Sequence, residues 1–258
     1  MSYLAVLVLA QFAALYPLLL WQMPEDTLPA GFARFNLGMT TVLLAMATVL
    51  AVAAGLTPVL MKLALLLAAI TLVLQSLLWQ QPARARRLLT PLMLVWGVTL
   101  WQPVLGAASI QAPLLSWIAI TLGGLSLGAV MYAMILGHWY LNEAELPVRH
   151  LQRATAMLLI ILLARLAWSV GILLLTETVV RQRLKPAYML LGELDGIFLW
   201  IGLLPGLLGS VGVAWMARRT AAMQSTQSTT GLLYVALVLV AMSTLSFSGY
   251  LLLMDLPL

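Results

Sequence analysis

The sequence predicts an all-α protein, a polytopic membrane helix bundle with about eight transmembrane helices. Hydrophobic residues make up 63% of the 258 residues and charged residues only 8%, whereas soluble domains carry about 25% charged residues. The apolar residues stand in runs of roughly 20, the length that crosses the core of a bilayer. Most charged residues stand in short clusters between these runs. The solvent for most of the chain is therefore lipid.

The apolar runs give the boundaries of the predicted spans. The fourth run is short, with Pro91 and Pro103 near its ends, and the connection 55–58 is so tight that the second and third spans should form an antiparallel hairpin. Since the spans use up the chain, we expect one transmembrane domain, residues 1–258, with no sizeable extramembrane domain. The predicted spans are Tyr3–Met23, Phe35–Gly55, Pro58–Trp79, Leu88–Gly106, Leu114–Leu141, Leu151–Thr176, Leu190–Met216 and Thr230–Met254.

Basic residues in the connections predict the orientation. If the side of the N-terminus is called side A, four basic residues fall on side A and eight on the opposite side B. Because cytoplasmic connections carry the excess of Lys and Arg, side B is predicted to be cytoplasmic. Both termini would then lie on the non-cytoplasmic side of a cell membrane, which we expect to be a bacterial inner membrane. The same bias accounts for the net charge of +5, and we expect no nucleic-acid partner.

The tripeptide Leu-Trp-Gln recurs at 20–22, 78–80 and 100–102, with a proline shortly after each copy. Indole rings favour the headgroup depth of a membrane, and proline ends a helix. The motif therefore predicts interfacial anchors at the ends of spans.

The fifth predicted span carries one stripe of unusual residues. Gly124 and Gly128 are four residues apart, a spacing that lets a neighbouring helix or a flat ligand approach the backbone. Helical steps of 3.6 residues continue this face through Tyr132 to His138, which Trp139 follows. One interpretation is a helix-packing groove with an aromatic foot. The other is a wall of a pocket for a quinone or another lipidic ligand, in which His138 bonds a ring carbonyl and passes a proton.

The connection after this span contains Glu143 and Glu145. Both lie close to His138 in the sequence, so both are candidates for a proton relay. The alternative is that they are ordinary solvated loop residues.

Arg165 stands about twelve residues into the sixth predicted span, roughly 18 Å deep at 1.5 Å per residue. An arginine at that depth costs about 2.5–3.5 kcal/mol on insertion scales. It should therefore face the bundle interior or a partner, and it needs an acceptor. We expect the hydroxyls of Ser169 or Tyr132, a backbone carbonyl or a ligand oxygen. The residue is either functional or a structural tie between helices.

The region around the seventh predicted span is irregular. An amphipathic piece on the membrane surface is plausible for Gln182–Leu191. The span itself contains Pro205, with Gly202 and Gly206 on either side, so we expect a kink or close packing. Broken helices occur in transporters, which keeps that class of function open.

Several chemistries are excluded or unsupported. The chain has no cysteine, which excludes disulfides and cysteine-ligated iron–sulfur clusters. Its two histidines cannot hold two bis-histidine haems, and no cluster has metal-ligand spacing. We therefore predict no catalytic residue, no metal site and no cofactor of its own, with quinone or bound lipid as the candidate ligand.

The stretch Gly123–Gly128, Gly-Gly-Leu-Ser-Leu-Gly, resembles glycine-rich helices of the NrfD-like quinol-interacting subunits of respiratory complexes. The resemblance covers these few residues and transfers no site residue.

Two functions follow from the sequence. The first is a membrane subunit of a larger respiratory or electron-transfer complex, part of a quinone-linked oxidoreductase whose other membrane subunits carry haem or iron–sulfur centres. In this function, the pocket for quinone or lipid would lie between the fifth and sixth spans. The second is a small secondary transporter or permease, with Arg165 and the broken seventh helix lining its path.

Overall fold

A computed structural model describes residues 2–22, 27, 29–56, 58–110, 113–140, 146–180 and 183–258. Within these residues, eight helical spans are long and apolar enough to cross a membrane, as predicted, and no sizeable further domain accompanies them. The chain divides into two compact units, Met1–Ser109 and Ile110–Leu258. Each unit contains four of the spans, and each is described separately below.

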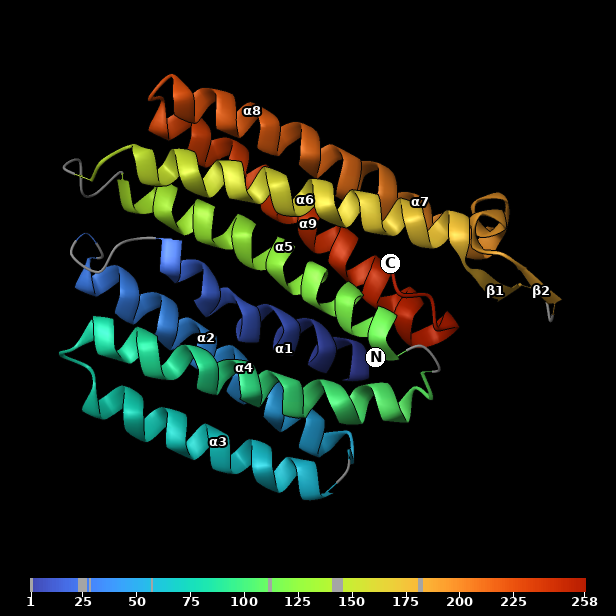
Figure 1. The fold of residues 1–258 in the computed structure, drawn as a ribbon, viewed down its shortest axis with the longest axis horizontal. Coiled ribbons are helices and arrows are strands. Elements are labelled where there is room, and N and C mark those ends of the chain that lie inside the picture. The colour runs from blue at the N-terminus through green and yellow to red at the C-terminus, as the bar shows by residue number, and fades with distance from the viewer. Residues whose placement is uncertain are drawn as a thin grey trace. The chain divides into compact units, whose positions relative to one another are not determined.

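Unit 1 is built from four antiparallel helices. They are α1 (Ser2–Leu19), α2 (Ala30–Ala53), α3 (Pro58–Leu77) and α4 (Pro82–Ala107). Helix α1 packs on α2 and α4, and α4 also packs on α3 (Figure 1). The predicted hairpin of the second and third spans is confirmed: α2 and α3 pack on each other. Gly55 takes a φ of 70° at the end of α2, a conformation that glycine adopts without strain.

The core of unit 1 is held by close packing and by hydrogen bonds between helices. A Cβ atom placed on Gly97 of α4 would lie 2.2 Å from the Cβ of Ala14, so α1 and α4 touch through their backbones. Polar contacts between helices include these: the Tyr16 hydroxyl donates to Asn36, the Trp96 indole donates to Thr48 over 2.9 Å, and Thr41 donates to Gln75 over 2.8 Å. Such satisfied pairs stabilise helix association in lipid.

Helix α4 differs from the predicted fourth span. It begins at Pro82, six residues earlier than the predicted start at Leu88, and Pro91 and Pro103 both lie inside it. Proline suits the first turn of a helix, where its missing N–H has no intrahelical partner. Arg84, Arg86 and Arg87 precede the predicted span but are helical. Arg86 is buried, and its guanidinium donates to the Leu20 carbonyl over 2.9 Å.

Unit 2 is a closed ring of four spans (Figure 1). Helix α5 (Pro113–Tyr140) packs on α6 (Arg149–Leu175) and on α9 (Thr226–Met254). The remaining span is composite, with α7 (Ile197–Ile201), a π-helical segment (Gly202–Gly209) and α8 (Ser210–Ala222). Helix α8 completes the ring by packing on α6 and α9.

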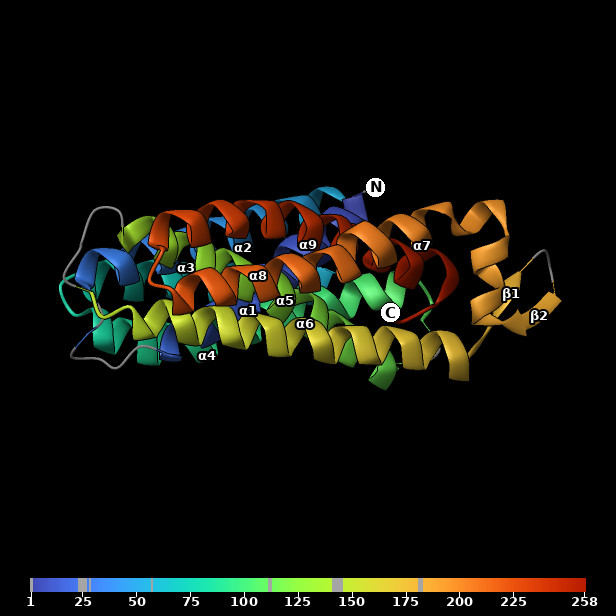
Figure 2. The ribbon, with the colours of Figure 1, turned by 90° about the horizontal axis from the view of Figure 1, so that it is seen from above.

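In its described residues, the connection between α6 and α7 forms a short β-hairpin and 3₁₀ turns, in the region where we expected an amphipathic surface piece. Strand β1 (Glu177–Val180) pairs antiparallel with β2 (Arg183–Pro186), and 3₁₀ turns follow over Ala187–Gly192 and Leu194–Gly196. Figure 2 shows the strands beyond the end of α6. The β-branched residues of β1 favour an extended strand over a helix. The composite span therefore begins at Ile197, later than the predicted Leu190.

Candidate functional site

Arg165 lies in the interior of unit 2, only 1% exposed. Its Nη1 donates to the hydroxyl of Thr244 on α9 over 2.8 Å. Its guanidinium carbon stands 5.3 Å from the centre of the Phe247 ring, within range of a cation–π contact. We expected Ser169, Tyr132, a carbonyl or a ligand as the acceptor, whereas the observed acceptor comes from the last helix. The arginine thus ties α6 to α9.

The hydrogen bonding around Arg165 is incomplete. Among the described residues, its Nε has no hydrogen-bond partner, and neither do the hydroxyls of Ser169 and Ser243. All three groups are buried. Ser169 stands one helical turn after Arg165 on the same face of α6, and Ser243 precedes Thr244 on α9. Buried polar groups in proteins nearly always have partners, so each of these groups is unusual.

The broken span contacts α9 at Ser243 and Phe247. Pro205 cannot donate the backbone hydrogen bond that an α-helix needs at its position, and the π-helical segment surrounds it. A Cβ atom on Gly206 would lie 2.9 Å from the backbone nitrogen of Ser243, and one on Gly202 would lie 2.8 Å from a ring carbon of Phe247. The predicted close packing of this span is confirmed. Phe247 therefore touches both the broken span and Arg165.

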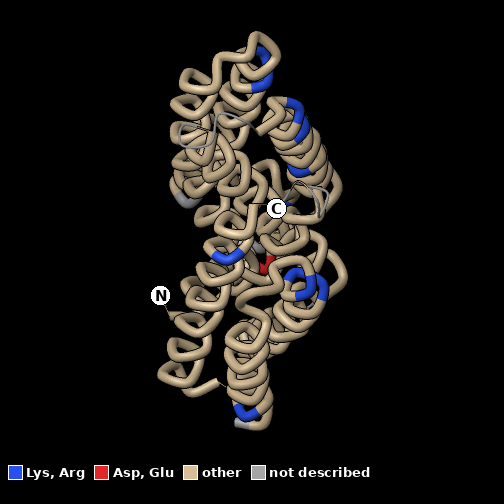
Figure 3. The backbone as a smooth tube through the Cα atoms, turned by 90° about the vertical axis from the view of Figure 1, so that its left-hand side faces the viewer, with Lys and Arg blue, Asp and Glu red and all other residues tan. Residues whose placement is uncertain are grey.

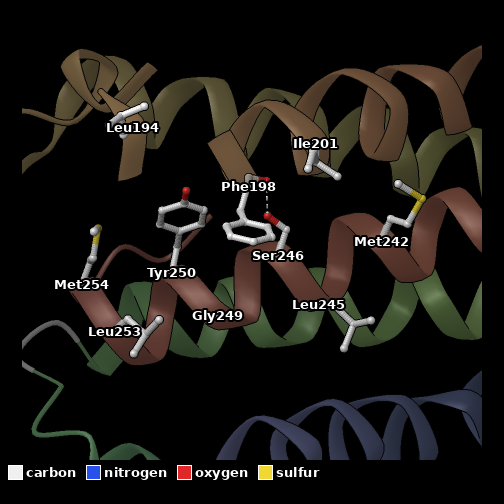
Figure 4. Close-up of a pocket in the computed structure, with 10 residues that line it drawn as sticks. All are labelled: Leu194, Phe198, Ile201, Met242, Leu245, Ser246, Gly249, Tyr250, Leu253 and Met254. Atoms are coloured by element: carbon white, nitrogen blue, oxygen red, sulfur yellow. Dashed lines mark hydrogen bonds between the residues drawn. The ribbon is translucent and has the colours of Figure 1, made fainter. Parts of the chain in front are cut away.

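A groove of about 510 Å³ lies between α7 and α9. Phe198 from α7 and Tyr250 and Ser246 from α9 point into it (Figure 4). The Ser246 hydroxyl donates to the Phe198 carbonyl over 2.5 Å, and the backbone N–H of Leu199 donates to the Tyr250 hydroxyl over 3.0 Å. Apart from Ser246 and Tyr250, the residues that line the groove are apolar. The full lining is Leu194, Phe198, Ile201, Met242, Leu245, Ser246, Gly249, Tyr250, Leu253 and Met254.

The predicted residues of α5 differ in their burial. Gly124, Gly128 and Tyr132 are buried, Trp139 is half-buried, and His138 is exposed at the end of the helix. None of them lines the groove between α7 and α9. The two relay candidates, Glu143 and Glu145, lie outside the described residues.

Sequence reasoning missed residues that the structure makes central. Thr244 is the acceptor for Arg165, and Ser246 and Tyr250 line the groove, yet none was singled out. A signal existed: Ser243, Thr244, Ser246 and Ser248 form a run of hydroxyl residues in the middle of an apolar span. His150, which lies one residue before the predicted sixth span, is buried at the start of α6.

Comparison with known proteins does not assign this chain to a family. Among the described residues, no group of three or more His, Asp or Glu residues is arranged to hold a metal ion. No protein-family model, no curated protein and no solved structure matches this chain.

Proposed function

We propose that this chain is an integral subunit of a larger respiratory or electron-transfer assembly, and that unit 2 binds a lipidic ligand such as a quinone. The groove between α7 and α9 carries the ligand proposal. Its lining is apolar apart from Ser246 and Tyr250, and Phe198 and Leu253 are exposed on its rim. From Met254 to Met242 it follows α9 for about 18 Å at 1.5 Å per residue. These dimensions and this chemistry suit an isoprenoid or acyl chain better than a polar solute.

The subunit proposal is supported by how little of the chain lies outside the spans. Eight spans account for most of the sequence, and the connection between α6 and α7 is the main extramembrane element of unit 2. Chemistry in such an assembly takes place in the bundle or on partner chains. Because the sequence contains no cysteine, cysteine-ligated iron–sulfur centres would belong to the partners.

Filling the groove should remove the lipidic ligand. Gly249 lines the groove, and a Cβ atom added there meets nothing within 4 Å, so Gly249→Leu should place a side chain in the groove. We expect the amount of quinone extracted from the purified protein, measured by chromatography against protein, to fall about tenfold or more. Gly231→Leu is the matched control, because Gly231 lies on the same helix, also meets nothing and is outside the groove. Equal quinone in both variants contradicts the ligand proposal.

Purification of a tagged chain in a gentle detergent tests the subunit proposal separately. We expect further membrane subunits to accompany it, with the absorbance of haem or iron–sulfur centres. A chain that purifies alone contradicts this proposal and favours the second candidate.

The second candidate is a small secondary transporter or permease. One observation favours it: Arg165 and the broken span meet through Phe247. In transporters, discontinuous helices and intramembrane charges lie beside the substrate path.

We also propose that both termini lie on the non-cytoplasmic side. Arginine–tryptophan pairs support this at side B, where Arg34 stands 5.4 Å from the ring centre of Trp79 and Arg219 stands 4.6 Å from that of Trp215. Figure 3 marks the basic residues in blue. Arginine and tryptophan both favour the membrane interface, and arginine is attracted to the anionic lipids of a cytoplasmic leaflet.

The orientation can be measured directly, because the chain has no native cysteine. Ser109 follows α4 on side A, and Ser225 precedes α9 on side B. We expect a membrane-impermeant maleimide to label Ser109→Cys in intact spheroplasts, and to label Ser225→Cys only after the membrane is opened. The reverse pattern would invert the proposed topology.

A further inference from the structure

We infer that unit 1 binds the headgroup of an anionic phospholipid between Arg34 and Arg84, at the turn that joins α3 to α4 on side B. This site lies in unit 1, whereas the groove between α7 and α9 belongs to unit 2. The inference therefore goes beyond the proposed function, and its test does not depend on that function.

The turn between α3 and α4 brings the two arginines to one place. Arg34 reaches the turn from α2: its Nε donates to the Trp79 carbonyl over 2.8 Å, and its Nη2 donates to the Gln80 side chain over 3.2 Å. Arg84, in the first turn of α4, donates to the Gln81 side chain over 2.6 Å. Both guanidinium groups are thus bonded to the three consecutive residues 79–81.

Two adjoining hollows lie at the same place. An open hollow of about 430 Å³ is lined by Gln81, Pro82, Ala83 and Arg84. Pro82 also borders a much smaller hollow, which Arg34 and Trp79 help to line. The larger hollow offers space for the polar head of a phospholipid beside Arg84, with Arg34 on the other side of Pro82.

The charge at this end of unit 1 favours an anion. Two carboxylates stand on side B of this unit, those of Glu25 and Asp26, and both lie outside the described residues. They face four arginines in number, so two positive charges remain even if both carboxylates form ion pairs. The four arginines are Arg34, Arg84, Arg86 and Arg87.

Arg34 and Arg84 are able to hold a phosphate group. Neither forms an ion pair within the described part of the chain. A guanidinium group carries more N–H donors than the hydrogen bonds to residues 79–81 use, so both side chains can also donate to a ligand. The planar fork of these donors matches the oxygens of a phosphate. The bonds to the turn hold the two groups in place before a ligand arrives.

The surroundings of the turn favour a lipid over a soluble anion. Trp79 is 48% exposed, and the guanidinium carbon of Arg34 stands 5.4 Å from its ring centre. Indole rings favour the depth of lipid headgroups. Among the eight spans, α3 has the smallest buried share, and Val73 and Leu77 are exposed one turn apart on it. Acyl chains can therefore lie along α3 while the phosphate meets the arginines.

The test follows the thermal melting of the full chain in a mild detergent as lipid is added. A ligand that binds only the folded state raises the melting temperature with its concentration. We expect a saturable rise with phosphatidylglycerol. Phosphatidylcholine should need about tenfold more lipid for half-saturation, because its choline cation would lie beside the arginines. Inorganic phosphate, which has no acyl chains, should give no rise.

Substitutions locate the site. Arg84→Gln should raise the half-saturating concentration of phosphatidylglycerol about fivefold, and Arg34→Gln/Arg84→Gln about 25-fold, since each arginine near an anionic lipid contributes about fivefold. Lys62→Gln is the matched control: Lys62 is also an exposed cation of unit 1, but it stands in the first turns of α3, at the opposite end of that helix. It should leave the half-saturating concentration unchanged.

Four results would overturn the proposal. Equal half-saturating concentrations for the two lipids would exclude a site selective for anionic lipid, and a saturable rise with inorganic phosphate would exclude a lipid as the required ligand. An unchanged half-saturating concentration in Arg84→Gln would exclude this position, as would an equal loss in Lys62→Gln. Arg84 is exposed and bonds only to its own turn, so Arg84→Gln should fold even if the double variant does not.

Discussion

Replacing Gly97 with alanine should lower the melting temperature of the protein by roughly 6–12 °C, a loss of about 3 kcal/mol. The new Cβ would lie 2.2 Å from the Cβ of Ala14 and 3.3 Å from the carbonyl oxygen of Ala10. Backbone atoms cannot rotate away as a long side chain can, so α1 and α4 would have to separate. The measurement is a thermal melt in a mild detergent, followed by tryptophan fluorescence.

Two further variants make this test specific. Gly106→Ala changes a glycine of the same helix that meets nothing within 4 Å. It should leave stability unchanged or raise it slightly, because alanine favours a helix over glycine. The double variant Ala14→Gly/Gly97→Ala should recover most of the loss, since it removes the atom against which the new methyl group collides. A loss that persists in the double variant would show that the cause is not this contact.

Replacing Thr244 with valine should cost about 2 kcal/mol or more, although the two side chains have nearly the same volume. The change removes the only hydroxyl that accepts from Arg165 in the described structure and leaves a buried charge with less compensation. Thr71→Val is the matched control: Thr71 is fully buried, but it donates only to the Leu67 carbonyl of its own helix, over 2.7 Å. The stability lost in Thr71→Val should stay below about 1 kcal/mol.

Removing the arginine as well should relieve the cost of Thr244→Val. Exchanging a buried charge for an apolar side chain of similar size is often neutral or stabilising, by about 1–4 kcal/mol. The double variant Arg165→Met/Thr244→Val should therefore be more stable than Thr244→Val alone. A double variant that is no more stable would show that the cost of Thr244→Val does not come from the uncompensated charge.

The number and type of the helices could be predicted from the sequence because lipid imposes a simple rule: about 20 apolar residues make one span. The tight connection before Pro58 was also enough to predict the hairpin of α2 and α3. The boundary of a helix was harder to predict where the helix begins with charged residues. The start of α4 at Pro82 was missed because Arg84, Arg86 and Arg87 resemble a connection in composition. Hydropathy does not show that Arg86 donates a hydrogen bond to the carbonyl of Leu20, just after the end of α1.

The burial of Arg165 in the bundle could be expected, because an arginine at that depth has to avoid lipid. Its partner could not be found, because Thr244 is 79 residues away in the chain and a threonine in an apolar span carries no signal of its own. The α5 stripe was weighed as a ligand wall from its spacing alone. Spacing does not reveal which neighbour covers a face, and His138 lies exposed at its end.

The π-helical segment Gly202–Gly209 has a consequence for how this span faces its neighbours. An α-helix advances about 100° per residue, so a segment with wider turns rotates everything that follows it. The faces of α7 and α8 are therefore rotated relative to the register of an unbroken α-helix, although they belong to one continuous span. The span can thus turn Phe198 and Ile201 of α7 toward the groove while α8 packs on α6 and α9.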